Sequence, residues 1–596
     1  MSASKPGSIQ GSLLPICRRD MDERGWQECD FVFVSGDAYV DHPSFAAALV
    51  CRVLESAGFR VGIIPQPDWK NPSSYAVLGK PRLGFLAGAG NMDSMVAHYT
   101  AAKRKRSDDA YSPGGKSGMR PDRAVLIYAE GIRRAYKDTA VIIGGIEASL
   151  RRFAHYDYWS DTVRRSILLD SKADILVYGM GEKPLLEIAR RLAAGEDTGS
   201  IQDVRGTCAR VHGKDAVGRW KDAVYLPGYE TIKEKDSSSL RAYADHFMIQ
   251  RKNSDPLSAK PLAEENDGGR FVIQNPPSLP LSQEELDKIY ELPFTRKAHP
   301  VYDAQGGINA LKEVSFSLVS SRGCFGGCSF CAITNHQGRA VTGRSRESLM
   351  GEARKFLTEE VHTKAQRHKG NEGFKGYIHD VGGPTANFFR PGCERQQKGG
   401  FCADRECLYP APCPKLKANH SEYLKTLKAL REIPGIKKVF IRSGIRFDFI
   451  QHDKKHGNEF LENLCAYHVS GQLKVAPEHV SANVLDAMGK SSSSCYEQFR
   501  NDFTAVNKKL KLKQYLLPYF ICAHPGAGSR EAEELAKYLK KTGFAPEQAQ
   551  EFYPTPGTMS TVMYYTGLDP RTMKPIYTVK SDKERRKQKD MIKRSK

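Results

Sequence analysis

The sequence contains three cysteines at a spacing that can bind a metal cluster. Cys324, Cys328 and Cys331 form C-x-x-x-C-x-x-C within SSRGCFGGCSFCAITNHQGR. Each thiolate can hold one iron of a cubane [4Fe–4S] cluster, and the fourth iron is then left without a protein ligand. An iron with a free position can bind a substrate or cofactor, as a catalytic zinc does. The triad therefore predicts a reactive cluster.

Two other interpretations of the triad remain open. A structural zinc would need a fourth ligand, for which His336 is the nearest candidate, but C-x-x-x-C-x-x-C is a poor zinc spacing. The three thiols could also be buried without any metal. We favour the cluster.

The residues around the triad predict a β-loop-α unit. The stretch VSFSLVSS (314–321) is apolar and β-branched enough for a buried strand. After the loop, Ser345 can cap a helix whose apolar residues between Leu349 and Leu357 share one face.

A second group of cysteines occupies an irregular, Gly- and Pro-containing insertion at 390–415. It consists of Cys393, Cys402, Cys407 and Cys413. Four thiolates in one loop suit a closed zinc site or a fully ligated auxiliary iron–sulfur cluster, and bound metal would supply folding free energy to such a loop. Unpaired thiols are the alternative, since the spacing matches no common zinc finger.

The order of the remaining elements predicts an α/β protein of several parts. From Phe31, short apolar strands that end in glycine alternate with helices, which predicts an N-terminal doubly wound (Rossmann-like) parallel sheet domain over 1–245. Residues 246–310 form a bridging segment, in which Ser282 and Glu285 make a capping box.

A second strand series predicts a partial (β/α)6 barrel over 311–570, followed by a basic tail, 571–596. Chemistry in such barrels lies at the carboxyl ends of the strands, so the triad would lie at the barrel mouth. The six predicted strands lie at 314–321, 376–384, 437–448, 470–479, 513–526 and 549–560.

Composition indicates the type of partner. The net charge of +21 favours a polyanion such as RNA. The last 17 residues contain nine Lys or Arg and three Asp or Glu, typical of a frayed helix or a nucleic-acid contact. No apolar run approaches the roughly 18 residues of a membrane span, and no export signal is apparent. We expect a soluble cytoplasmic protein.

Long phrases of the sequence resemble one protein family. GDAYVDHPSF, GGIEASLRRFAHYDYWSD, VYGMGE, SSRGCFGGCSFC, VGGPTAN, VAPEH and YPTPGTMSTVMYYTG are similar to those of YgiQ-type radical S-adenosylmethionine (SAM) proteins. The resemblance runs from about Leu14 to Asp569. It implies that the cysteine triad holds a [4Fe–4S] cluster and that the amino and carboxylate groups of SAM chelate the open iron.

The same resemblance implies further site residues and a reaction. An electron from a low-potential donor of the flavodoxin or ferredoxin type would drive cleavage of SAM to a 5′-deoxyadenosyl radical, which attacks an unknown substrate. Pro384 replaces the Glu that usually follows the glycine motif. The implied SAM-contacting residues are Phe330, Gly382, Gly383, Ser443 and Glu478.

Two rival functions remain. One is a non-catalytic, metal-stapled nucleic-acid-binding protein, which would explain the charge and both cysteine groups. The other is a cobalamin-dependent radical methylase, because the N-terminal layout resembles cobalamin-binding domains. That domain type carries D-x-H-x-x-G, and His42, His98 and His155 each lack the flanking residues. We therefore do not expect cobalamin.

Overall fold

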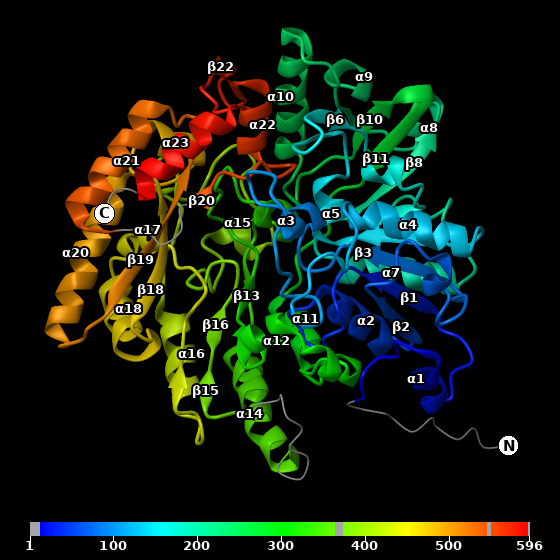
Figure 1. Ribbon diagram of the computed structural model, residues 1–596, viewed down its shortest axis with the longest axis horizontal. Coiled ribbons are helices and arrows are strands. Elements are labelled where there is room, and N and C mark those ends of the chain that lie inside the picture. The colour runs from blue at the N-terminus through cyan, green and yellow to red at the C-terminus, as the bar shows by residue number, and fades with distance from the viewer. Residues whose placement is uncertain (1–11, 364–372, 545–549, 594–596) are drawn as a thin grey trace.

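The computed structural model describes residues 12–363, 373–544 and 550–593. Two α/β halves lie side by side, and the last helices return from the barrel half toward the N-terminal half (Figure 1). Within the described ranges, no helix is both long and apolar enough to cross a bilayer.

The N-terminal half is built on a nine-stranded sheet whose first five strands are parallel, as predicted. Strand β1 (Phe31–Ser35) is apolar apart from Ser35 and is fully buried because helices cover both of its faces. Helices α2 (Ala46–Ser56) and α7 (Glu182–Ala193) pack on one face, and α4 (Ala124–Ala135) packs on the other. The parallel strands, in spatial order, are β2 (Val61–Pro65), β1 (Phe31–Ser35), β3 (Gly84–Gly88), β4 (Val141–Gly144) and β7 (Ile175–Val177).

The rest of this sheet was not predicted. Strands β8 (Thr207–His212), β11 (Arg270–Gln274) and β10 (Leu262–Asn266) are antiparallel neighbours, with β9 (Val224–Tyr225) at the edge. A tight Gly-containing turn joins β10 to β11, and an antiparallel pair needs no crossover helix. The sheet therefore continues past residue 245, the predicted end of the first domain.

Helix α10 (Ser237–Lys252) lies between β9 and β10 in sequence, and helix α11 (Gln283–Glu291) follows the last strand of the sheet. The Ser282 hydroxyl accepts from the Glu285 amide, and the Glu285 carboxylate accepts from the Ser282 amide. The predicted capping box is confirmed.

The second half is the predicted series of six parallel strand segments. Each segment pairs with the next in chain order, and the third and fourth join through an isolated parallel bridge between Ile445 and Val475. The strands are β12 (Ser317–Val319), β15 (Tyr377–Ile378) with β16 (Asp380–Gly382), β17 (Lys438–Val439), β18 (Gln472–Glu478), β19 (Tyr515–Cys522) and β20 (Gln550–Glu551). The crossover helices include α14 (Arg346–Thr363), α16 (Ser421–Arg431), α20 (Ser493–Lys509) and α21 (Ser529–Thr542).

Helix α14 shows why the chain after the cysteine loop folds back onto the strands. The Ser345 hydroxyl accepts from the Ser348 amide at 3.1 Å, so Ser345 caps the helix as predicted. Leu349, Ala353 and Phe356 are fully buried on one face. Their burial fixes the loop at the carboxyl end of β12.

The C-terminal segment is docked rather than frayed. Helix α22 (Met559–Thr566) is buried along its whole length. Helix α23 (Asp582–Lys593) buries Arg585, Gln588 and Ile592 on one side. The Gln588 side chain bonds to the backbone of Ala523 and Ala527. Residues 594–596 of the tail lie outside the described ranges.

Candidate active site

The cysteine triad lies on a tightly wrapped loop between β13 (Ser321–Arg322) and α13 (Ile333–Gln337). Gly323 and Gly327 have φ of +81° and +68°, where side chains are strained. A Cβ at Gly323 would overlap the carbonyl of Ala340, and one at Gly327 would overlap the Glu406 carboxylate. Both positions therefore require glycine.

The three thiols interact with one another in a buried setting. Burial and the nearby Cys324 and Cys328 sulfurs raise the pKa of Cys331 to about 12, and burial also raises the pKa of Cys324. The Thr385 hydroxyl lies 3.4 Å from the Cys324 sulfur, and the Arg446 guanidinium donates to the Cys328 sulfur at 3.6 Å. Thiolates can be sustained here only beside strong positive charge.

These features fit an iron–sulfur cluster. Each thiolate ligand binds its own iron, so the sulfurs must be neighbours but need not share one centre. The irons would supply the positive charge that deprotonates the buried thiols. The His336 ring, the candidate fourth zinc ligand, bonds instead to the Ser149 hydroxyl at 3.1 Å. Across the described ranges, no three His, Cys, Asp or Glu side chains are grouped to hold a single metal ion.

Two of the predicted SAM residues lie together at the ends of neighbouring strands. The Ser443 hydroxyl donates to the Asp380 carboxylate, which also accepts from the Arg442 and Ser443 amides at 2.7 and 3.1 Å. Gly382 packs so closely on this pair that a Cβ would overlap Ser443. Burial raises the pKa of Asp380. Asp380, Ser443 and the buried backbone of Gly382 thus form a closely packed polar wall.

Glu478 is buried and its backbone is constrained. It ends β18 with φ of +69°, an uncommon conformation for a residue with a side chain. Its carboxylate lies 3.7 Å from the Lys490 ammonium, which also donates to the Ala476 carbonyl. Burial raises the pKa of Glu478.

The two other predicted SAM residues make separate contacts. Gly383 lies against the backbone of Ser321, the residue that begins β13. The Phe330 ring meets the His524 ring edge to face at 6.0 Å and packs on Val484 and Met488 of α19 (Ala482–Met488). The SAM contacts of these residues stay predictions.

The second cysteine group partly assembles beside the first. Burial raises the pKa of Cys407 to about 12, and Cys393 and Cys413 lie near enough to contribute to this shift. Cys407 and Cys413 pack on the same apolar cluster as Cys324, whereas Cys402 is exposed. A metal site here remains a prediction.

The insertion is joined to the triad loop by charge. The Glu406 carboxylate pairs with Arg339, which follows the loop, at 2.5 Å and with Arg251 of α10. It also lies directly against Gly327. A movement of the insertion would therefore displace the loop that carries the triad.

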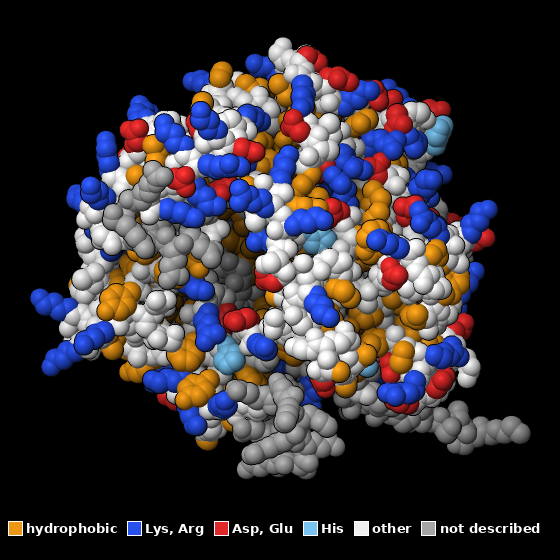
Figure 2. Space-filling view, viewed as in Figure 1, with side chains coloured by type: hydrophobic (Ala, Val, Ile, Leu, Met, Phe, Trp, Pro, Cys, Tyr) orange, Lys and Arg blue, Asp and Glu red, His pale blue; other side chains and the backbone are white. Residues whose placement is uncertain are grey.

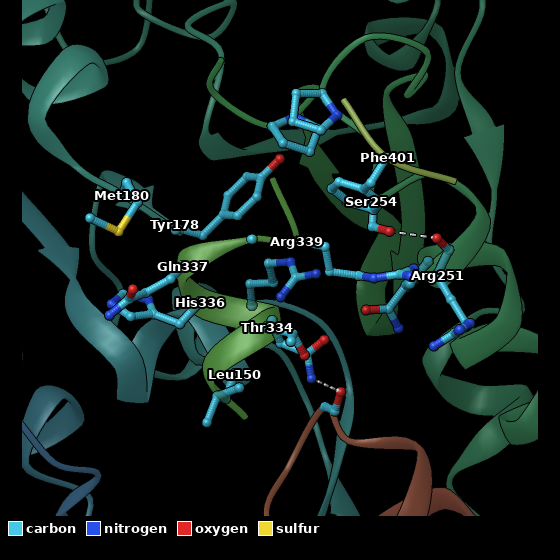
Figure 3. A pocket seen from close by; sticks show the side chains of 18 of the residues that line it. Leu150, Tyr178, Met180, Arg251, Ser254, Thr334, His336, Gln337, Arg339 and Phe401 are labelled. Carbon is cyan, nitrogen blue, oxygen red and sulfur yellow. Dashed lines mark hydrogen bonds between the residues drawn. The ribbon is translucent and has the colours of Figure 1, made fainter. Parts of the chain in front are cut away.

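A cavity of about 160 Å³ opens beside Cys328 and Cys331. Tyr178 from the N-terminal half, Arg251 from α10 and Arg339 reach toward the same space (Figure 3). Three elements from different parts of the chain thus enclose a polar and aromatic chamber at the triad.

The three histidines weighed for cobalamin are bonded within the protein. His42 is fully buried between the Ser44 amide and the Arg296 guanidinium. His98 bonds to the Asp122 carboxylate, and the Nδ1 atom of His155 bonds to the Phe153 carbonyl. These contacts do not test cobalamin binding.

Sequence patterns missed several side chains of this site: Asp380, Thr385, Arg446, Asp448 and Lys490. Four of them are neighbours of predicted residues and Asp448 contacts Arg446, but none belongs to a metal or phosphate motif. The one available signal was Arg446-x-Asp448 at the carboxyl end of the third predicted strand, where barrel chemistry is expected.

Comparison with known proteins identifies the family. The family model described as Radical SAM N-terminal matches residues 13–317, just over half of the 596-residue chain. A domain of unknown function, DUF3362, matches 547–595. A UPF0313 protein of Clostridium botulinum (strain ATCC 19397 / Type A) is 50% identical over 580 residues, 97% of this chain and 86% of that protein. One from Clostridium perfringens (strain 13 / Type A) is 51% identical over 583 residues, 98% and 85% of the two chains.

Two solved structures are also similar. The radical SAM methyltransferase TsrM from Kitasatospora setae, with cobalamin and a [4Fe–4S] cluster bound, aligns with a TM-score of 0.48 and 14% identity over 89% of this chain and 74% of that one. The cobalamin-dependent SAM radical enzyme OxsB, with aqua-cobalamin bound, aligns with a TM-score of 0.46 and 11% identity over 88% and 54%.

Proposed function

Because the chain belongs to the radical SAM N-terminal and UPF0313 families, we propose that it binds a [4Fe–4S] cluster and uses it to cleave SAM reductively. Cys324, Cys328 and Cys331 would hold the cluster. The observation that carries the proposal is this group of three interacting thiols, two of them bordering a cavity.

The protein residues would bind and orient the reactants. When bound by the triad, a cluster of this kind would supply the electron for reductive cleavage of SAM to methionine and a 5′-deoxyadenosyl radical. The backbone at Gly382 and the Ser443–Asp380 pair would position the SAM amino group, and Phe330 would pack near the adenine. Arg446 donates to the Cys328 sulfur and so stabilises its negative charge.

The cavity beside the triad would hold the substrate. Its walls include Tyr178, Arg251 and Arg339, and both arginines pair with the single carboxylate of Glu406. A chamber enclosed from three sides excludes water from a reactive radical.

The finer assignments rest on the sequence. The phrases around the triad and in VAPEH support a YgiQ-type protein, and the charge of +21 supports an RNA substrate. Reduction would come from a flavodoxin- or ferredoxin-type donor in the cytoplasm. An auxiliary cluster or zinc would occupy the second cysteine group.

Anaerobic reconstitution with iron and sulfide tests the proposal. We expect about four irons bound by the triad, an electron paramagnetic resonance signal of the reduced protein that changes on adding SAM, and production of 5′-deoxyadenosine. Cys328→Ala should lose the SAM-sensitive signal and the product. Cys17→Ala, a change at the start of helix α1 (Arg18–Glu23), is the matched control and should lose neither.

Three results would reject the proposal. The first is 5′-deoxyadenosine production that survives in each single triad variant. The second is a reconstituted protein that holds zinc at the triad, and the third is a cluster whose spectrum does not change with SAM. Either of the last two would favour the non-catalytic metal-stapled binder.

A further inference from the structure

The two most basic runs of the sequence, almost 480 residues apart, meet in the folded chain. The first is the segment 103–106, with sequence KRKR, and the second is helix α23. Arg585 of α23 donates to the Ala101 carbonyl at 3.2 Å, next to the first run. A single surface therefore combines both charge runs.

Tyr158 joins the two runs. The Lys103 ammonium lies 4.6 Å from the centre of the Tyr158 ring, and the Arg585 guanidinium lies 5.7 Å from it and donates to its hydroxyl. Tyr158 itself is buried. The contact is thus a packed junction and holds the two runs in a fixed relation.

Much of the charge at this junction is exposed and has no opposite charge. Within the described ranges, the side chains of Arg104, Lys105, Lys583, Arg586 and Lys587 form no ion pair, and all five are exposed. The last three line a shallow hollow on α23 together with Asp582, Asp590 and Met591. Lys and Arg side chains gather over α21 and α23 and continue toward the middle of this face, where it is hollowed (Figure 2).

Half-buried aromatic rings lie beside the same charges. The Trp159 ring lies 6.0 Å from the Tyr99 ring and 5.4 Å from the Tyr553 ring. Lys103 donates to the Trp159 carbonyl. All three rings are partly exposed.

We propose that this basic–aromatic surface binds a single-stranded polynucleotide. Fixed, unpaired cations attract a phosphate backbone, and partly exposed rings offer faces on which bases stack. A membrane surface would need only the charge and would favour an exposed apolar face, which α23 does not have because its apolar side is buried. The rings therefore favour a nucleic acid over anionic lipid.

The surface is connected to the cavity at the triad. Met559 and Val562 of α22 line that cavity, while Tyr564 of the same helix packs against Tyr158 at 5.9 Å. A strand bound at the surface would thus lie one helix away from the chamber. The charges and rings of the surface suffice to bind a polynucleotide, and this binding does not depend on SAM cleavage.

Binding is measured by fluorescence anisotropy of labelled 20-nucleotide oligo(U) and oligo(dT) with the full chain at several salt concentrations. We expect the logarithm of the binding constant to fall linearly with the logarithm of salt concentration. Arg104→Glu/Lys105→Glu and Arg586→Glu/Lys587→Glu should each weaken binding at least tenfold and reduce the salt slope by about 1.4, the value for two lost contacts to a single strand.

The matched control changes the net charge equally at another place. Lys508→Glu/Lys513→Glu, exposed at and after the end of α20, should bind within about twofold of the original chain. Oligonucleotide should also quench tryptophan fluorescence, and Trp159→Phe should remove most of that quenching. Cys328→Ala should bind like the original chain, so the outcome is separable from that of the SAM experiment.

Three results would overturn the proposal. Both basic variants could bind as tightly as the original chain, or the control could lose as much affinity as they do. Anionic phosphatidylserine vesicles could bind the chain while neither oligonucleotide does. If oligo(U) and oligo(dT) bind at the surface with different affinities, the proposal holds. The tighter ligand then shows whether the surface prefers RNA or DNA.

Discussion

The guanidinium of Arg446 donates a hydrogen bond to the sulfur of Cys328, 3.6 Å away. Asp448 fixes it there, accepting from Nε at 2.9 Å and from a terminal nitrogen at 2.5 Å. Arg446 and Asp448 are both buried. A fixed cation beside one cluster ligand would stabilise negative charge on that sulfur and hence on the reduced cluster.

Removing this donor should make the cluster harder to reduce. Arg446→Met/Asp448→Asn removes the donor without leaving a buried carboxylate unpaired. We predict a midpoint potential lower by about 60 mV or more, a tenfold change in a one-electron equilibrium. Potentiometric titration followed by electron paramagnetic resonance measures it. Arg442→Met, at a half-exposed arginine, is the control, and equal potentials in all three proteins would refute the prediction.

Filling the space at Gly382 should block SAM while sparing the cluster. Gly382→Ala places a methyl group against the Ser443 hydroxyl and the Asp380 carboxylate. We predict at least tenfold weaker SAM binding with unchanged iron content, read from the SAM-dependent change of the reduced signal. Gly444→Ala is a close control, because its added Cβ has no atom within 4 Å apart from those of its own chain neighbours. Normal SAM binding by Gly382→Ala would remove Gly382 from the site.

The main fold and the triad could be predicted because their signals are local. Each parallel strand is a short apolar run that ends in glycine or a polar loop, and alternation with helices predicts a parallel sheet. The spacing of Ser345, Leu349 and Phe356 predicted the helix after the triad. The capping box of Ser282 and Glu285 predicted α11.

The remaining features depend on contacts between distant residues. Arg446 contacts Cys328, although more than a hundred residues separate them in the sequence. Arg585 contacts Tyr158 across a separation of more than four hundred residues in the sequence. Strands β10 and β11 form a hairpin, and β11 then pairs with β8, which lies about 50 residues before the hairpin in the sequence. Sequence spacing contains no information on such pairings, so the docked tail could not be foreseen.

Glu406 should support the triad loop through its two arginines. Glu406→Gln leaves Arg251 and Arg339 without their carboxylate, and breaking a buried pair costs about 3 kcal/mol or more. We predict a lower midpoint temperature for the first thermal transition and slower cluster assembly. Glu394→Gln, at a carboxylate that is 80% exposed, should change neither. An unaltered melting curve for Glu406→Gln would show that the insertion does not support the loop.

The second cysteine group should bind its own metal. We predict that Cys407→Ala/Cys413→Ala lowers the metal content of the anaerobic protein by one zinc or four irons, measured by elemental analysis. The SAM-dependent signal should persist, because the triad cysteines are intact. Cys465→Ala, at a buried cysteine in the barrel core, is the control. Equal metal content in the two variants would mean that the insertion holds no metal.

Acid should destabilise the barrel half through His468. Burial lowers the pKa of His468 to about 4 from 6.5. Its Nδ1 atom bonds to the Val439 carbonyl at 2.7 Å, while Nε2 is buried without a partner among the described residues. The folded chain thus takes up this proton more weakly than the unfolded chain does, and stability falls as the pH drops from 6.5 toward 4.

A substitution at this histidine should therefore remove part of the acid sensitivity. The loss at pH 5 attributable to His468 is about 2 kcal/mol from the shift in pKa. His468→Gln keeps a donor for Val439 but cannot be protonated in this range. We predict that its midpoint in urea changes less between pH 7 and pH 5 than that of the original chain. His212→Gln, at an exposed ring, should follow the original profile. Identical pH profiles for both variants would show that His468 is not what makes the fold acid-sensitive.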